Sequence, residues 1–220
     1  MIYMRHDFRY ISRKDPKLRD SYNNLMRLLQ AVRNDLKEYT FQHKIIGSYS
    51  RNMVTYDAKS NTGFDFDVNI YPNDEKYSAE EIKRLFKKTL DKNCKAFGFD
   101  YAEDSTRVLT IKVKDRKNAS VVYSVDFAFV YDYKDKDGLL RQKYIHFNKE
   151  QGSYDWRDQP NSYYLLDEKV RWIKGKGLWE IQLKPYYIEK KNNNNDSTVH
   201  SRTIFAISVN EICQKYGYMR

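Results

Sequence analysis

One stretch, Phe64–Tyr71, constrains the fold more than any other part of the 220-residue chain. Its apolar residues alternate with polar ones: Phe64, Phe66, Val68 and Ile70 with Asp65, Asp67 and Asn69. This alternation predicts a β-strand with one apolar and one acidic face, because successive side chains of a strand point to opposite sides. Two carboxylates on one face repel each other, and a fold that keeps them there usually supplies a cation. The stretch therefore predicts a cation-holding strand.

A Gly-Ser pair precedes this strand. Gly47 and Ser48 follow the apolar Ile45-Ile46, which is typical of a tight turn that exposes backbone N–H groups to an anion. An anion-holding turn beside a cation-holding strand indicates a nucleoside triphosphate (NTP) carried with magnesium. The polar segment 49–63 then adds Arg51, which is either a phosphate ligand or a solvated loop cation. The role of this segment is open between a substrate lid, a partner surface and an insertion.

A third acidic residue lies in a later apolar strand. Asp126 is the only charged residue between Val121 and Val130, and such an acid is costly unless it is paired, hydrogen-bonded or bound to metal. If this strand lies beside the first, Asp126 joins Asp65 and Asp67 on one surface. Three carboxylates so placed can hold two divalent ions about 3.5–4 Å apart. Their oxygens suit Mg²⁺, with Mn²⁺ as an alternative. The competing interpretation is a buried acid satisfied by an arginine.

The remaining periodicity predicts an α+β plan. Asp15-Pro16 starts a helix that runs to about Lys37, and the Ser78/Glu81 capping box starts a second. Residues 106–147 read as an antiparallel meander of strands. Residues 152–161 are turn-rich and mark a boundary, and three further helices follow: 163–174, 179–190 (kinked at or starting near Pro185) and 203–216. We therefore divide the chain into a core, 1–150, and a C-terminal helical extension packed on it, 151–220.

Composition narrows the class of partner. The formal net charge of +10 favours a polyanion such as nucleic acid or a nucleotide, although the lysines are scattered along the chain. No apolar run approaches the roughly 20 residues that span a bilayer, and the first ten residues lack the apolar centre of a signal peptide. We expect a reduced, cytoplasmic setting with no membrane partner. The four histidines show no zinc-ligand spacing.

In this order, Gly47-Ser48, Asp65-Phe66-Asp67 and Val125-Asp126-Phe127 resemble the polymerase-β-like nucleotidyltransferase superfamily. The tail, Tyr186–Asn192 with the helix 203–216, resembles its oligoadenylate synthetase and bacterial cyclic-oligonucleotide synthase branch. The resemblance implies a mixed or antiparallel nucleotidyltransferase sheet flanked by helices, with a C-terminal helical layer. The sequence departs from the family pattern at two places. The interval between Ser48 and Asp65, residues 49–64, is longer than usual, and Arg51-Asn52-Met53 replaces a second small-residue signature that commonly follows the Gly-Ser turn.

The resemblance also implies roles for residues. Asp65, Asp67 and Asp126 bind metal and are catalytic, with Asp126 also helping to activate the acceptor hydroxyl. Gly47 and Ser48 hold the triphosphate, and Arg51 is an additional candidate for nucleotide binding.

The function expected from these residues is a Mg²⁺-dependent nucleotidyltransferase that binds ATP or another NTP. It moves a nucleoside monophosphate to a hydroxyl by a two-metal mechanism and releases pyrophosphate. The acceptor is open between a nucleotide (giving an oligonucleotide or cyclic product), an RNA end, a small molecule and a protein side chain. Two alternatives are a non-catalytic nucleic-acid-binding module on the same fold and a toxin-type transferase that modifies tRNA or protein. The sequence leaves base preference and oligomeric state open.

Overall fold

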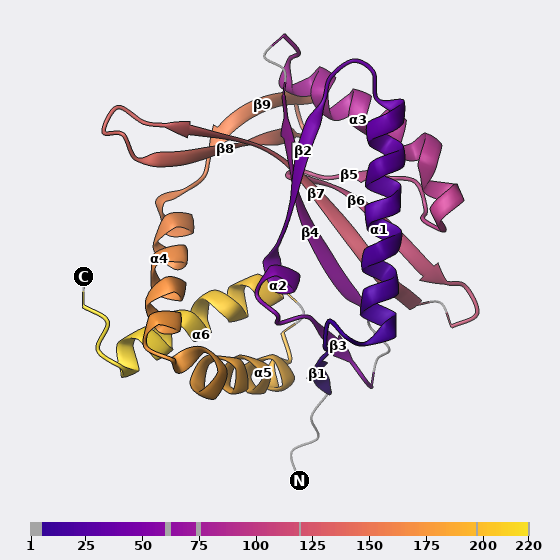
Figure 1. Cartoon of the computed structure of the whole chain (residues 1–220). Coiled ribbons are helices and arrows are strands. Elements are labelled where there is room, and N and C mark those ends of the chain that lie inside the picture. Colours follow the sequence, from indigo (N-terminus) through magenta and orange to yellow (C-terminus); the bar gives the residue numbers. More distant parts are fainter. Residues whose placement is uncertain (1–5, 60–62, 74–75, 119, 197, 220) are drawn as a thin grey trace. The chain divides into compact units, whose positions relative to one another are not determined.

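The computed structural model describes residues 6–59, 63–73, 76–118, 120–196 and 198–219 (Figure 1). The chain forms two compact units. The first, here the sheet unit, comprises Tyr10–Thr55 and Thr62–Gln159. The second, here the helical unit, comprises Met1–Arg9, Tyr56–Asn61 and Pro160–Arg220. The division into core and extension at residue 150 stays a prediction.

The sheet unit alternates helices with the strands of one mixed sheet. In chain order its elements are α1 (Pro16–Asp35), β2 (Phe41–Ile46), α2 (Gly47–Ser50), β4 (Phe64–Pro72), α3 (Ala79–Cys94), η1 (Lys95–Phe97), β5 (Glu103–Asp104), β6 (Val108–Asp115), β7 (Ser120–Lys134), β8 (Leu140–Asn148) and β9 (Ser153–Asp158). The strand order is β2-β4-β7-β6-β5, with β8 paired to the far half of β7 and β9 paired to β8. Only β4 and β7 pair in parallel; the other neighbours in this sheet are antiparallel.

The two long helices begin where the sequence predicts. The Asp15 side chain accepts a hydrogen bond from Lys17 N at 2.8 Å, and Pro16 occupies the first turn of α1. Ser78 and Glu81 cap α3 reciprocally. Both helices lie along one face of the sheet (Figure 1). They bury its apolar side chains, as where Phe86 of α3 meets Phe129 edge-on with ring centroids 5.1 Å apart.

One secondary-structure prediction was wrong. Residues 153–158, expected to be turn-rich, form strand β9, which pairs with β8 in the register Phe147↔Tyr154. The rings of these two residues stack at 4.4 Å. The strand was missed because Gly152, Asp155, Asp158 and Pro160 are residue types that favour turns. β9 lies at the edge of the sheet, where charged side chains are tolerated. The segment 49–63 and the N-terminal residues likewise hold short paired strands, β3 (Thr55–Asp57) and β1 (Phe8–Tyr10).

The helical unit contains α4 (Asn161–Gly175), the π-helix η2 (Trp179–Leu183), α5 (Lys184–Asn193) and α6 (Ser201–Lys215). Trp179 and Tyr187 each pack edge-on against Phe205 of α6. Pro185 lies in the first turn of α5, directly after the π-helix, which explains the break predicted there. Phe8 belongs to this unit because its N–H donates to Asn192 Oδ1 at 2.6 Å.

The predicted α+β class with a mixed sheet flanked by helices is confirmed. Within the part of the chain that the structure describes, no helix has the length and apolar character needed to cross a membrane.

Candidate active site

The three predicted acids lie on one face of the sheet, opposite to the face covered by α1 and α3. The parallel pairing of β4 with β7 sets Asp67 directly beside Asp126, and Asp65 beside Ser124. Alternate residues of the same strands, such as Phe66 and Phe127, are fully buried on the helix-covered side. The sequence predicted the apolar and the acidic face of β4. The register of β4 with β7 places Asp126 on the same face as Asp65 and Asp67.

Two hydroxyl groups contact the acids from neighbouring strands. Thr110 of β6 is the register partner of Asp126, and its Oγ1 donates to Asp126 Oδ1 at 2.5 Å. Ser124 of β7 is the register partner of Asp65, and its Oγ donates to Asp65 Oδ1. The antiparallel and parallel pairings therefore each place one hydroxyl beside one carboxylate.

The Gly-Ser turn lies against Asp67. β2 ends at Ile46, the register partner of Asp67, and the chain then turns into the four-residue helix α2. Gly47 has φ +65°, and a Cβ built there would lie 1.7 Å from Asp67 Oδ2. Only glycine combines this left-handed backbone with so close an approach. The turn predicted to face an anion thus adjoins the acidic surface.

Aromatic stacking holds this turn in place. The Tyr49 ring lies parallel to that of Tyr22 in α1, at 4.9 Å, and tilted against Phe66 at 5.4 Å. The Arg13 guanidinium lies 4.6 Å from the centre of the Tyr49 ring and donates to Tyr49 O. Tyr49 therefore ties α2 to both the helix layer and β4.

Ser48 and Arg51 belong to the same turn. Ser48 O accepts a hydrogen bond from Met53 N at 2.9 Å, and Arg51 N donates to Gly47 O at 3.3 Å. Both residues are half-buried. The structure thus places the Gly47-Ser48 turn beside Asp67, on the strand that also carries Asp65, and places Arg51 at the end of the turn.

Comparison with known proteins bears on the fold. No protein-family model and no curated protein sequence matches the chain. Solved structures do resemble it, and three of them are compared with it. They are the CdnE cyclic dinucleotide synthase of Elizabethkingia meningoseptica with GTP and Apcpp (TM-score 0.52), the CdnE c-di-GMP synthase of Capnocytophaga granulosa (0.57) and GTP-bound DncV of Vibrio cholerae (0.54). Each is 15% identical in sequence and covers 90–94% of this chain. The chain shares the fold of these three proteins.

The predicted resemblance to polymerase-β-like nucleotidyltransferases is confirmed at the level of fold. The chain spans 70%, 63% and 51% of the lengths of these three neighbours, in the same order. Their names describe their own activities and ligands.

Electrostatics on the acidic face of the sheet favour a cation. Burial raises the pKa of the Asp126 carboxyl above its ordinary value, and the negative charge of Asp65 raises it further. The Thr110 hydrogen bond and the Lys112 charge oppose this rise. Lys112 is held by Glu103 at 2.7 Å, and among the described residues neither Asp65 nor Asp126 forms an ion pair. The arginine partner considered for Asp126 is therefore not found in that part of the chain.

The donor set fits a hard divalent cation. The three residues offer only carboxylate oxygens, which Mg²⁺ and Mn²⁺ prefer, and a cation would offset the repulsion between Asp65 and Asp126. Over the described residues, no three His, Cys, Asp or Glu side chains already converge as a metal-binding cluster. The fit to such an ion thus rests on the carboxylate donors of the three residues and on their positions in neighbouring strands, and not on a cluster that is already formed.

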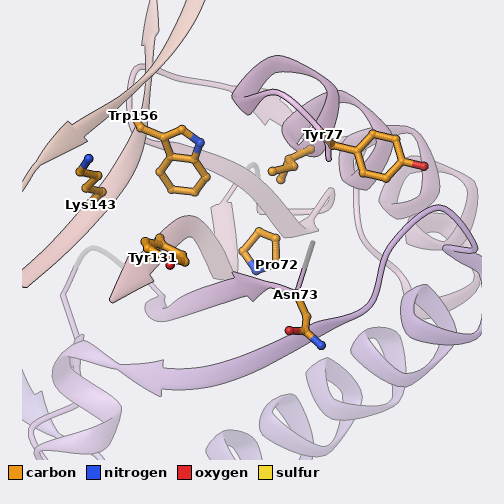
Figure 2. Close-up of a pocket in the computed structure, with 7 residues that line it drawn as sticks. Pro72, Asn73, Tyr77, Tyr131, Lys143 and Trp156 are labelled. Atoms are coloured by element: carbon orange, nitrogen blue, oxygen red, sulfur yellow. The ribbon is translucent and has the colours of Figure 1, made fainter. Parts of the chain in front are cut away.

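A separate cavity of about 430 Å³ lies elsewhere in the sheet unit. It is lined by Pro72, Asn73, Tyr77, Ile82, Tyr131, Lys143 and Trp156. Figure 2 shows Pro72 between Trp156 and Tyr131 on one side and Tyr77 on the other, with the Tyr77 hydroxyl pointing away from Pro72. Neither the predicted acids nor Gly47 and Ser48 line this cavity, so it is distinct from the candidate active site.

Sequence reasoning missed Thr110 and Ser124. Each is an ordinary small polar residue of a strand, and single-sequence patterns do not show which carboxylate it faces. The one available signal was strand alternation, which places Ser124 on the same face of its strand as Asp126.

Proposed function

We propose that this chain is a nucleotidyltransferase that moves a nucleoside monophosphate from an NTP to a hydroxyl and releases pyrophosphate, with Mg²⁺ or Mn²⁺ as its cofactor. The observation that carries the proposal is the register of Asp67 beside Asp126, with Asp65 on the same face and the Gly47 turn against Asp67. The synthase fold supports it.

Each site residue has a proposed role. Asp65, Asp67 and Asp126 hold the divalent cations through their carboxylate oxygens. Gly47 and Ser48 orient the triphosphate through backbone N–H groups of the first turn of α2, which have no acceptor within the helix. Arg51 adds a positive charge at the end of that turn. A bound divalent cation lowers the pKa of the acceptor hydroxyl and neutralises charge on the phosphates.

The proposed reaction is an in-line displacement. The acceptor hydroxyl gives its proton to an Asp126 carboxylate oxygen. The acceptor oxygen forms a bond to the α-phosphorus. The bond from the α-phosphorus to the bridging oxygen breaks, and pyrophosphate leaves with the electron pair.

The acceptor we propose is a second nucleotide, which would give an oligonucleotide or cyclic product. The support is that three structures of this fold are described as cyclic dinucleotide synthases or as a GTP-bound relative.

The test is pyrophosphate release. Purified protein is incubated with Mg²⁺ and the four NTPs, singly and in pairs, and pyrophosphate and nucleotide products are measured. We expect turnover by the wild-type protein and a loss of at least about 100-fold in the double variant Asp65→Ala/Asp67→Ala. A matched control, Asp20→Ala/Asp137→Ala, removes two exposed acids away from this face and should keep wild-type turnover.

Turnover that persists unchanged in the Asp65→Ala/Asp67→Ala variant would refute the proposed site. Salt-sensitive RNA binding without turnover of any NTP would instead favour the non-catalytic module. Labelling of tRNA or protein by NTP in a lysate, without nucleotide products, would favour the toxin-type transferase.

A further inference from the structure

Two acids that are far apart in the sequence receive the same kind of neighbour. Asp65 is contacted by the hydroxyl of Ser124 and Asp126 by the hydroxyl of Thr110. In both cases the donor is the residue directly opposite on the neighbouring strand. On the same face of β6 and β7, the register pair on one side of Thr110 and Asp126 is apolar, Val108 with Ala128, and the pair on the other side is Lys112 with Ser124. The hydroxyls thus occur at the positions of the acids and not throughout this face.

The hydrogen bonds leave one oxygen of each acid open. Both hydroxyls donate to Oδ1. Among the described residues, no hydrogen bond or ion pair reaches Oδ2 of Asp65 or Asp126. Each carboxylate is therefore fixed through one oxygen, and its second oxygen is not used by another side chain in that part of the chain.

We infer that Thr110 and Ser124 are positioning residues that orient the Asp126 and Asp65 carboxylates for a divalent cation. This inference rests on the proposed function. A hydroxyl is a neutral donor, so it fixes the side-chain rotamer of an acid without cancelling its charge. An arginine or lysine at the same place would orient the carboxylate but compete with the cation.

The alternative is that the hydroxyls only stabilise the fold by satisfying half-buried acids. The two roles differ in what a variant loses, since a stabilising role affects unfolding while a positioning role affects cation affinity in protein that remains folded.

The experiment measures Mn²⁺ binding without nucleotide. Purified full chain is titrated with Mn²⁺ alone, and free Mn²⁺ is followed by its electron paramagnetic resonance signal. We expect Thr110→Val, which keeps the side-chain shape, and Ser124→Ala each to weaken Mn²⁺ binding by about 10- to 100-fold. Thr110→Ser restores the hydroxyl and should restore affinity. Thermal unfolding of every variant shows whether it is folded at the temperature of the titration.

A matched control is Thr89→Val. The Thr89 hydroxyl donates to Leu85 O within α3, away from the acids, so this variant should keep wild-type Mn²⁺ affinity. If the wild-type protein binds Mn²⁺ and releases pyrophosphate while folded Thr110→Val and Ser124→Ala bind Mn²⁺ as Thr89→Val does, the positioning role is wrong and the proposed function stands. If the wild-type protein neither binds Mn²⁺ nor turns over NTP, the proposed function is wrong and the positioning role falls with it.

Discussion

Gly47 lies against the carboxylate of Asp67, so that a Cβ at residue 47 would meet Asp67 Oδ2 at 1.7 Å and Cγ at 2.6 Å. We predict that Gly47→Ala forces the Asp67 side chain out of place and lowers kcat/KM for pyrophosphate release by at least about 100-fold. The φ of +65° adds a backbone cost of about 1–2 kcal/mol in the free energy of unfolding. Steady-state kinetics and urea unfolding measure the two effects.

Gly138→Ala provides the control for this prediction. Gly138 has a similar φ of +74°, but a Cβ there would meet no atom within 4 Å. It should show the same order of backbone cost and retain activity. Equal losses of activity in the two variants would mean that the contact with Asp67 is unimportant.

Asp126→Asn should give an inactive protein that is more stable than the wild type near pH 7. The pKa of the Asp126 carboxyl is raised in the folded state, so the folded state binds more protons than the unfolded state between the usual value of 3.8 and the raised one. The stabilisation from this group is present below pH 3.8 and is lost as the pH rises through the raised pKa. Asparagine does not titrate, and it removes the repulsion from Asp65. We expect Tm to rise by roughly 2–4 °C at pH 7.

Thermal scans from pH 4 to pH 8 measure this difference, with the exposed-site variant Asp20→Asn as control. The difference in Tm between Asp126→Asn and the wild-type protein should widen as the pH rises. A gap that narrows with rising pH, or a variant that retains turnover, would contradict the assignment of Asp126.

Lys83 provides a stability prediction outside the site. Its side chain is fully buried, its Nζ lies 2.7 Å from Asp104 Oδ1, and it donates to Ser105 O at 2.9 Å. Burial lowers the pKa of this ammonium, and the Asp104 partner opposes the change. Lys83→Met leaves Asp104 and the Ser105 carbonyl without this donor, so we expect a loss of about 3 kcal/mol in the free energy of unfolding. Chemical denaturation measures it.

The neighbouring residue supplies the matched variant. Arg84 forms an exposed ion pair with Glu80 one helical turn away, at 2.9 Å. Arg84→Met should change the free energy of unfolding by less than about 1 kcal/mol. Similar losses for the two variants would show that burial does not set the strength of the Lys83 pair.

Tyr49 tests whether stacking holds the Gly-Ser turn. Tyr49→Ala removes the ring that packs against both Tyr22 and Phe66, and we expect it to cost about 2 kcal/mol of stability and to raise KM for NTP. Tyr49→Phe keeps the ring and should stay close to wild type in both. A Phe variant as impaired as the Ala variant would assign the effect to the hydroxyl instead.

The sequence alone determined the local features of this protein. Strand periodicity separated Asp65 and Asp67 from the apolar face of β4, and capping residues marked the starts of α1 and α3, because these signals depend on neighbours in the chain. It also identified Asp126 as a lone acid in an apolar strand. It missed β9, whose stability comes from pairing with β8 and not from its own pattern.

Only the tertiary structure decided which residues meet. The parallel register of β4 and β7 sets Asp67 beside Asp126, although they are far apart in the chain, and the same register sets Ser124 beside Asp65. A shift by one residue would turn one set of side chains to the other face. The approach of Gly47 to Asp67 likewise depends on how β2 pairs with β4. Alternation along a strand determines which face of the sheet a side chain lies on. Its neighbours on that face come from other strands, and the pairing of those strands depends on contacts between residues that are far apart in the sequence.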